Sequence, residues 1–307
     1  MRRTLAEALR TAPVVLDGGL ATQLESAGAD VSSALWSARL LHDDPAAVVA
    51  AHAAYFAAGA RVATTASYQA SDQGYEAAGL GPAAPLLRRS VELAVRARAE
   101  AGLDDRAWVA ASVGPYGAVL ADGSEYTGAY ADELGVAVLR AFHRPRLELL
   151  AEAGADVLAC ETVPAAAEAE ALLTELDRLA VPAWLSLTTV VDAHGVPCTR
   201  RGEPAAQVFA MAAQVPSVVA VGVNCTTPRG VLPAVRAAAA TGLPVVVYPN
   251  SGEQWDAGAR RWTGSSALDE QDVASWVAAG ARLVGGCCRV GSAEVAAVAR
   301  ALQSPLT

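Results

Sequence analysis

The chain has 307 residues, of which 53% are hydrophobic and 18% are charged, and its net charge is −9. A balance this acidic argues against a nucleic-acid surface, so we expect no nucleic-acid partner. All 23 basic residues are arginines, which excludes Schiff-base chemistry on a lysine and a P-loop with its lysine.

Neither a targeting segment nor a membrane span is visible in the sequence. Residues 1–12 contain arginines but no long apolar region, and no uninterrupted apolar run reaches about 18 residues. Five cysteines in such a chain favour the cytosol, where thiols stay reduced. We therefore expect a cytoplasmic protein with no membrane partner. The oligomeric state stays open between a monomer and a small homo-oligomer.

Short apolar runs alternate with longer helical patterns along the chain. The first run is followed by a helical pattern at about 43–58, with Asp43 or Asp44 as the cap and Pro45 in the first turn. Eight runs are predicted to be strands, at 13–16, 62–68, 108–113, 157–159, 183–188, 218–224, 245–248 and 283–285. The other predicted helices lie at about 84–101, 131–153, 166–179, 203–214, 229–240, 269–279 and 292–303.

One kind of join recurs before three of these strands. Gly-Ala followed by Arg or Asp stands at 59–61, 154–156 and 280–282, between a helical pattern and a strand. The glycine suits the position after a helix. Eight strand–helix units predict an α/β fold, a closed (β/α)₈ barrel, with residues 1–307 as a single domain. An open doubly wound sheet is the alternative, but no Gly-x-Gly-x-x-Gly follows the first strand.

Polar residues gather where the predicted strands end. In a barrel these carboxyl ends meet at one face, where the active site lies. Long loops at 114–130, 192–201 and 250–266 follow three of the strands. The polar ends include Asp17, Thr64-Thr65, Glu161-Thr162, Thr188-Thr189, Asn224-Cys225, Tyr248 to Asn250 and Cys287-Cys288.

Three cysteines lie at such strand ends. Cys225 follows one apolar run, and Cys287 and Cys288 follow Gly285-Gly286 at the end of another. Successive side chains of a strand point to opposite faces, so the chain must leave strand geometry for both sulfurs to reach one centre. The two glycines would allow the unusual backbone angles and the close approach that such a break needs. Three thiols with no obvious fourth ligand predict a zinc site with one open position. For Cys225 alone, a packed non-ligating side chain is the alternative.

The charge of such a site points to a reaction. Three thiolates on Zn²⁺ give a net charge of −1, which suits holding a further thiol as thiolate better than activating water. The matching electrophile is a positively charged methyl donor. Asp17 and Glu161 would face each other across the barrel mouth and hold an α-ammonium group. Either could instead cap a helix, and Asp17 is equally suited to that role. Backbone N–H groups near Gly18-Gly19 or Thr65 would suit a carboxylate.

Five motifs together resemble the homocysteine S-methyltransferase family over nearly the whole chain. They are Asp17-Gly18-Gly19, Gly114-Pro115-Tyr116-Gly117, Gly222-Val223-Asn224-Cys225, the run 248–253 (YPNSGE) and the run 285–289 (GGCCR). The resemblance implies a zinc-dependent barrel with Cys225, Cys287 and Cys288 as ligands. It also implies contacts from Asp17, Thr65 and Glu161 to the amino and carboxylate groups of homocysteine. Gly18, Asn224, Tyr248 and Glu253 complete the predicted substrate site. The family often has Thr where this chain has Val290.

The resemblance also bears on the methyl donor. Members that use methylfolate carry folate and cobalamin domains, and betaine users tend to be longer than this chain. The segments 114–130 and 248–253 look most like members that use S-methylmethionine or S-adenosylmethionine. Aromatic and acidic side chains would hold the sulfonium, with Tyr116, Tyr248, Glu253 and Trp255 as candidates. The expected reaction is attack of the zinc-held L-homocysteine thiolate on the sulfonium methyl, giving methionine.

Other readings remain open at this point. A betaine-type donor, or selenocysteine or another thiol as acceptor, would use the same barrel. In a different class, the cysteines would buffer zinc or form a redox pair without catalysis. Asp17 and Glu161 argue against this class, since a buffer needs no such acidic pocket.

Overall fold

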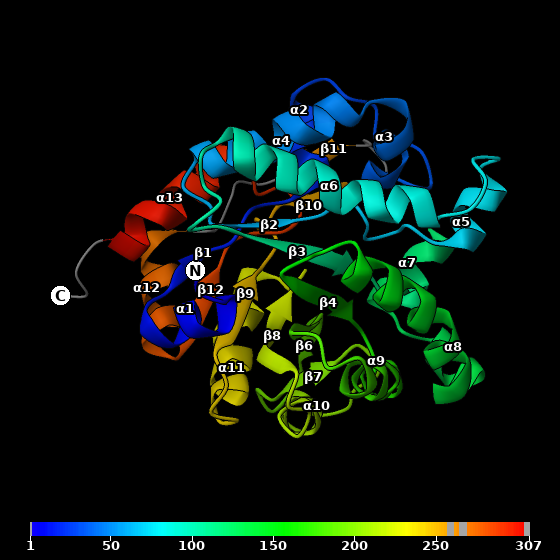
Figure 1. Ribbon diagram of the computed structural model, residues 1–307. Helices are drawn as coiled ribbons and strands as arrows, with labels where there is room; N and C mark the ends of the chain where they lie inside the picture. Colours follow the sequence, from blue (N-terminus) through cyan, green and yellow to red (C-terminus); the bar gives the residue numbers. More distant parts are fainter. Residues whose placement is uncertain (1, 257–260, 264–268, 304–307) are drawn as a thin grey trace.

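The computed structural model describes residues 2–256, 261–263 and 269–303, and within 254–256 and 261–262 it describes the backbone alone (Figure 1). None of the described helices combines the length and the apolar character that crossing a membrane requires.

Eight parallel strands form a barrel at the centre of the molecule. They are β1 (Val14–Val15), β2 (Val62–Thr64), β3 (Trp108–Val113), β4 (Val157–Val163), β5 (Ala183–Leu187), β8 (Val218–Asn224), β9 (Val245–Tyr248) and β12 (Ala281–Val284). Their order in the sheet is β1-β12-β9-β8-β5-β4-β3-β2, and a single bridge between Leu16 and Val62 joins the two ends of this order. The predicted barrel is therefore confirmed in preference to an open sheet, and its seam lies between β1 and β2.

A helix follows each barrel strand and packs outside it (Figure 1). These helices are α4 (Pro45–Ala57), α6 (Ala84–Glu100), α8 (Tyr130–Glu152), α9 (Ala166–Leu179), α10 (Ala205–Ala212), α11 (Pro228–Ala239), α12 (Glu270–Ala278) and α13 (Ser292–Gln303). Each begins and ends within two residues of the predicted bounds. Asp44 is the cap of α4, because its carboxylate accepts a hydrogen bond from the N–H of Ala47 at 3.0 Å.

Short elements that the pattern did not predict are added to this frame. They are α1 (Leu5–Thr11), α2 (Leu20–Ser26), α3 (Ser37–Asp43), α5 (Asp72–Ala77), α7 (Tyr116–Leu120), the 3₁₀ helix η1 (Ser124–Tyr126), and two hairpins, β6 (Thr189–Val191) with β7 (Pro197–Thr199) and β10 (Gln254–Asp256) with β11 (Arg261–Thr263). Leu5 and Leu9 of α1 pack with residues of the barrel interior such as Trp108 and Leu283. A second apolar layer lies between the strands and the outer helices.

The recurring Gly-Ala join has the predicted geometry. Gly59, Gly154 and Gly280 follow the last residues of α4, α8 and α12 and have φ angles of 109°, 88° and 119°. These left-handed values favour glycine, which has no Cβ to clash. The glycine therefore ends each helix and turns the chain into the next strand.

One strand prediction was too long. β2 ends at Thr64, whereas the apolar pattern continues to residue 68. The N–H of Thr65 still donates to the carbonyl of Ala110, and after it side-chain hydrogen bonds replace those between the strands. The Oγ1 of Thr65 lies 2.7 Å from the Oγ of Ser67, which in turn donates to the carbonyl of Ser112 at 2.7 Å. The segment leaves the sheet and lines the barrel mouth. β4 and β12 also differ from the predicted 157–159 and 283–285, since β4 extends to Val163 and β12 begins at Ala281.

The stability of the fold should depend on His52 in mildly acidic solution. His52 of α4 is fully buried, neither ring nitrogen has a hydrogen-bond partner among the described residues, and burial lowers its pKa from the usual 6.5 to about 4. Below pH 6.5 the His52 imidazole becomes protonated in the unfolded chain but stays neutral in the folded chain. The free energy of unfolding should therefore fall by up to about 3 kcal/mol between pH 6.5 and pH 4 from this group.

Urea unfolding of the wild type and of His52→Leu at pH 7 and pH 5 measures this effect. The variant should lack roughly 2 kcal/mol of the wild-type loss between these two pH values. The same loss in both proteins would show that His52 is not the titrating group.

Candidate metal centre and substrate pocket

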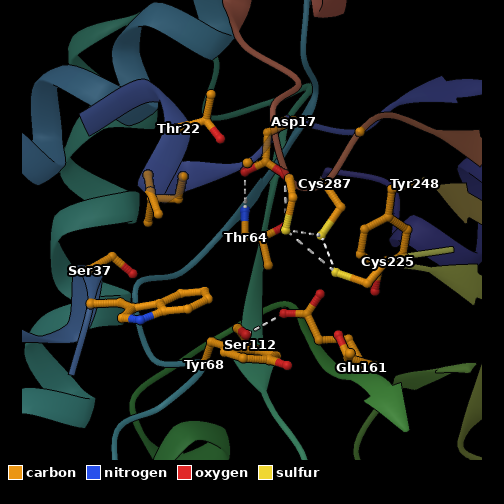
Figure 2. A pocket seen from close by; sticks show the side chains of 18 of the residues that line it. Asp17, Thr22, Ser37, Thr64, Tyr68, Ser112, Glu161, Cys225, Tyr248 and Cys287 are labelled. Atoms are coloured by element: carbon orange, nitrogen blue, oxygen red, sulfur yellow. Dashed lines mark hydrogen bonds between the residues drawn. The ribbon is translucent and has the colours of Figure 1, made fainter. Parts of the chain in front are cut away.

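Cys225, Cys287 and Cys288 meet at the carboxyl end of the barrel (Figure 2). The Sγ atoms of Cys225 and Cys287 are 2.6 Å apart, and each lies 3.9 Å from the Sγ of Cys288. Tetrahedral zinc with Zn–S bonds of about 2.3 Å places its sulfurs about 3.8 Å apart. Two of the three distances match this spacing, and a metal would draw Cys225 and Cys287 apart. Across the described part of the chain, this is the one group of three potential ligand side chains close enough to share an ion.

The backbone around the cysteines leaves strand geometry, but not at the glycines. Cys225 has a φ of 46° directly after β8, and Arg289 has a φ of 65° directly after Cys288. Gly285 and Gly286 have no such angle; a Cβ would lie 2.4 Å from the carbonyl of Asp17 at Gly285 and 2.0 Å from the Val290 side chain at Gly286. The predicted unusual angles are therefore absent at the glycines, whereas the predicted close approach of the backbone is confirmed. Both glycines are required for close packing against β1 and the loop that follows.

The three thiols titrate unequally because they are crowded together. Hydrogen bonds from the thiols of Cys225 and Cys287 lower the pKa of Cys288 well below its usual range. The thiol of Cys287 interacts with the sulfurs of Cys225 and Cys288, and this raises its pKa well above the usual value. The cluster by itself therefore favours one thiolate, and three thiolates together call for a bound cation.

A pocket opens beside the three sulfurs (Figure 2). Of the predicted substrate residues, it is lined by Asp17, Gly18, Thr65, Glu161 and Tyr248. Glu125 brings a third carboxylate, and the lining contains no arginine or histidine among the described residues. The pocket therefore suits positively charged ligands.

Asp17 points into this pocket from the end of β1. Its carboxylate accepts hydrogen bonds from the N–H of Thr64 at 2.6 Å and from the Thr64 hydroxyl at 2.8 Å. Asp17 is thus held by the neighbouring strand end and caps no helix. Burial raises its pKa to about 8, with a further contribution from the charge of Glu161, while the Thr64 hydrogen bonds oppose the rise.

Glu161 reaches the same pocket from β4 (Figure 2). Its carboxylate accepts a hydrogen bond from the hydroxyl of Ser112, and burial raises its pKa to about 7 against the opposing effect of Ser112 and Tyr248. The Tyr248 hydroxyl also lies 2.7 Å from the Oγ of Ser186 and accepts from the indole N–H of Trp184 at 3.0 Å. Tyr248 therefore belongs to a buried network that orients Glu161.

The backbone donors near Gly18 and Thr65 are partly occupied. The N–H of Gly19 donates to the carbonyl of Val290, and the N–H of Thr65 donates to the carbonyl of Ala110, each at 2.9 Å. Within the described residues, the N–H groups of Gly18 and of the first turn of α2 have no such partner. Gly18 is also required sterically, because a Cβ would lie 2.3 Å from the Val290 carbonyl.

Asn224 ends β8 as predicted, but the side chain predicted to contact the substrate bonds to neighbouring strand ends. Its Oδ1 accepts from the N–H of Thr162 at 2.7 Å and from the Ser186 hydroxyl at 2.8 Å, and its Nδ2 donates to the Thr162 hydroxyl at 2.7 Å. These bonds hold Thr162 at a φ of 60°, in the left-handed region. Asn224 does not line the pocket; it joins the ends of β4, β5 and β8 and sets the position of Cys225.

Replacing Asn224 with alanine should therefore lower stability before it affects substrate binding. The change leaves the buried N–H of Thr162 without its acceptor, and we expect a loss of about 2–3 kcal/mol in the free energy of unfolding. Urea denaturation measures this loss, and Asn224→Asp, which keeps the acceptor oxygen, should lose less. Unchanged stability together with a raised KM for the substrate would instead assign Asn224 to substrate binding.

Two other predicted side chains, Glu253 and Tyr116, are not in the pocket. Glu253 lines a neighbouring groove, where its carboxylate accepts from the Oγ of Ser251 at 3.0 Å and from the Nε of Arg289 at 3.3 Å. Tyr116 packs against the rings of Tyr130 and Phe142. The side chain of Trp255 lies outside the described residues.

Several pocket residues were not predicted. Trp36, Tyr68, Glu125 and Tyr126 all line it, and the Tyr126 hydroxyl donates to the Sγ of Cys225 at 3.8 Å. Glu125 and Tyr126 belong to the loop 114–130, whose tyrosines and acidic residues were the one sequence signal for them. The folding of that loop over the barrel mouth depends on distant contacts that the local pattern does not encode.

Comparison with known proteins gives consistent results. The model of a family described as Homocysteine S-methyltransferase matches residues 14–302. The chain is 45% identical to the Homocysteine S-methyltransferase of Escherichia coli (strain K12), over 93% of this chain and 94% of the relative. It is 43% identical to Homocysteine S-methyltransferase 3 of Arabidopsis thaliana (94% and 89%) and 40% identical to the Selenocysteine Se-methyltransferase of Brassica oleracea var. italica (94% and 89%). The metallated crystal structure of the homocysteine methyltransferase MmuM from Escherichia coli superposes with a TM-score of 0.84 at 41% identity, covering 96% of this chain and 98% of that one.

Proposed function

The chain belongs to the homocysteine S-methyltransferase family, and we propose that it transfers a methyl group from a sulfonium donor to the thiol of L-homocysteine, giving methionine. The donor would be S-methylmethionine or S-adenosylmethionine. The observation that carries the proposal is the convergence of three cysteine sulfurs on a pocket whose ionisable lining includes Asp17 and Glu161. This arrangement offers a place for a thiol nucleophile and for the ammonium group of an amino acid.

We further propose that Cys225, Cys287 and Cys288 hold zinc. Their sulfurs are soft, closely spaced ligands, and the described part of the chain offers no fourth ligand beside them. Zinc at these sulfurs would lower the pKa of the acceptor thiol and keep it as the nucleophilic thiolate.

The acceptor amino acid would be held by both of its charged groups. Asp17 and Glu161 would take the α-ammonium, which replaces the water that each carboxylate lost on burial. The free N–H groups of Gly18 and of the first turn of α2 would take the carboxylate. Held at these two points, the acceptor would present its sulfur towards the cysteines.

Methyl transfer then requires alignment more than acid–base chemistry. The acceptor sulfur forms a bond to the methyl carbon while the bond to the sulfonium sulfur breaks, and the electron pair of that bond stays on the leaving thioether. A negative thiolate and a positive sulfonium become two neutral thioethers. A buried pocket favours this loss of charge, because water would otherwise stabilise the separate ions.

The experiment that tests the proposal begins with the metal content of the purified protein. Methionine formation from homocysteine is then measured with S-methylmethionine, S-adenosylmethionine and betaine in parallel. We expect bound zinc and the highest rate with a sulfonium donor. The highest rate with betaine would overturn the choice of donor, and metal binding without any turnover would favour a zinc-buffering protein.

Selenocysteine is a second candidate acceptor. It is favoured by the 40% identity to the Selenocysteine Se-methyltransferase of Brassica oleracea var. italica. A competition between homocysteine and selenocysteine at equal concentration, read as the ratio of the two methylated products, decides between them.

The five free cysteines support a cytosolic location for this reaction. We also infer that residues 1–307 act as one domain.

A further inference from the structure

Glu125 is a buried carboxylate that no described residue neutralises. It is 6% exposed, it lines the pocket beside the sulfurs, and its Oε2 has no hydrogen-bond partner within the described residues. The ion pairs among these residues do not include it either. Burying a charge without a partner is costly, so a side chain placed in this way points to a cation that arrives with a ligand.

The fold fixes Glu125 in this position. η1 begins after Gly123, which has a φ of 83°, and the carboxylate of Asp122 accepts from the N–H of Ser124 at 2.9 Å. A Cβ on Gly117 would lie 2.5 Å from the backbone nitrogen of Glu125, so only glycine there lets the turn pack so closely. The next residue, Tyr126, reaches the sulfur of Cys225. The turn therefore holds Glu125 and Tyr126 in the lining of the pocket that the three cysteines also line.

Glu125 comes from η1, away from the strand ends that carry the other two carboxylates. The charge of Glu161 contributes to the raised pKa of Asp17, which identifies these two as a pair. The pKa of Glu125 is raised chiefly by burial and then by the charges of Asp122 and Cys288. Asp17 and Glu161 thus act on each other, and Glu125 is a further carboxylate in the lining of the same pocket.

Arg200, which packs on the ring of the neighbouring Tyr126, forms no ion pair with Glu125 within the described residues. The guanidinium of Arg200 lies 5.7 Å from the centre of the Tyr126 ring and donates to the hydroxyl of Thr188. It is not among the residues that line the pocket. Tyr126 itself does line the pocket, together with Glu125.

We propose that Glu125 is the counter-ion of the sulfonium donor, while Asp17 and Glu161 bind the ammonium of the acceptor. This inference rests on the proposed function. The donor must bring its positive sulfur within reach of the acceptor sulfur, and that place lies in the pocket that the cysteines, Glu125 and Tyr126 line together. A carboxylate beside an aromatic face is a suitable environment for a sulfonium.

The charge of the donor disappears during the reaction, and this predicts a kinetic signature. Glu125 attracts the bound sulfonium more strongly than the transition state, in which part of the positive charge is already lost. Removing the carboxylate should therefore raise the KM for the donor and leave kcat equal or higher. A residue that only shapes the pocket would lower kcat together with kcat/KM.

The test compares a charged ligand with a neutral one of nearly the same shape. Isothermal titration measures the binding of S-methylmethionine and of methionine, which lacks the positive charge, to the wild type, Glu125→Gln, Glu125→Asp and Glu133→Gln. Glu133 is exposed at the start of α8 and provides the same change of charge outside the pocket. Steady-state kinetics with homocysteine completes the set.

For Glu125→Gln we expect S-methylmethionine to bind about 10- to 100-fold more weakly, with methionine binding changed by less than about twofold. Glu125→Asp should recover part of the affinity, and Glu133→Gln should match the wild type. Thermal unfolding should place Glu125→Gln at or above the wild-type midpoint, because an unpaired buried charge is removed.

Two results would overturn the inference. One is unchanged S-methylmethionine binding in Glu125→Gln, and the other is an equal loss for S-methylmethionine and methionine. Failure of the proposed function is distinguishable, because then the wild type itself forms no methionine from any sulfonium donor. A wild type that turns over S-methylmethionine beside a Glu125→Gln variant with the same donor KM overturns only the role of Glu125.

Discussion

Replacing Cys287 with serine should remove the bound metal and lower methyl transfer to homocysteine by about a thousandfold. A serine hydroxyl stays protonated at neutral pH, so the site would retain two of its three anionic ligands. The acceptor thiol would then keep its ordinary pKa and attack mainly as the weakly nucleophilic thiol. A thousandfold change corresponds to about 4 kcal/mol in the activation free energy, which is within the range that a catalytic metal contributes.

Metal content after dialysis and the rate of methionine formation measure this effect. Cys198→Ser is the matched control, because the thiol of Cys198 lies in the β6–β7 hairpin and donates to the carbonyl of Val196 at 3.6 Å. It should retain both the metal and the rate. Circular dichroism tests that both variants fold. A folded Cys287→Ser protein with full zinc and a normal rate would show that the ligand assignment is wrong.

Replacing Glu161 with glutamine should raise the KM for homocysteine by about 100-fold. The amide keeps the shape and the hydrogen bond from Ser112 but loses the charge that would meet the α-ammonium group. Truncating one partner of a buried charge pair costs roughly 2–5 kcal/mol, and 100-fold corresponds to about 3 kcal/mol. Metal content should stay unchanged, because Glu161 is not one of the clustered ligand side chains.

4-Mercaptobutanoate, which is homocysteine without the amino group, distinguishes this role from a general effect on the pocket. The wild type should prefer homocysteine strongly, and Glu161→Gln should lose most of that preference. Equal losses on the two acceptors would mean that Glu161 shapes the pocket without binding the ammonium. Measurements above pH 7 give the clearest contrast, because the wild-type carboxyl, whose pKa is about 7, is then ionised.

The barrel and its helices could be predicted because their signals are local. Apolar runs, helical periodicity and the glycines at 59, 154 and 280 each act within a few residues, and barrel topology then brings the strand ends together. The barrel topology was sufficient to predict that the cysteines, Asp17 and Glu161 lie together at the carboxyl ends of the strands. The apolar pattern predicted the end of β2 poorly, because the hydroxyls of Thr65 and Ser67 compete with the ladder.

The roles of individual side chains were harder to predict than their positions. Asn224 lies next to a cysteine and within a family motif, yet its three hydrogen bonds are made to Thr162 and Ser186. The position of Asn224 beside a cysteine in the sequence could not distinguish this structural role from a contact with the substrate. Glu125 and Tyr126 depend on how the loop 114–130 folds over the mouth, which is set by packing at Gly117 and Cys225. Such long-range contacts leave no periodic pattern in the sequence from which they could be predicted.

The position of the cysteines also bears on how the ring of strands stays shut. Cys225 and Cys287 lie 62 positions apart in the chain, on either side of β9, and β12 pairs with β1 beside the seam. A metal ion at these sulfurs would cross-link the two segments and shorten the loop that the unfolded chain must close. Without this link, β12 and β1 would exchange their amide hydrogens through local opening sooner than β3 and β4. The metal ion that activates the acceptor thiol would thus also stabilise the closed barrel at its seam.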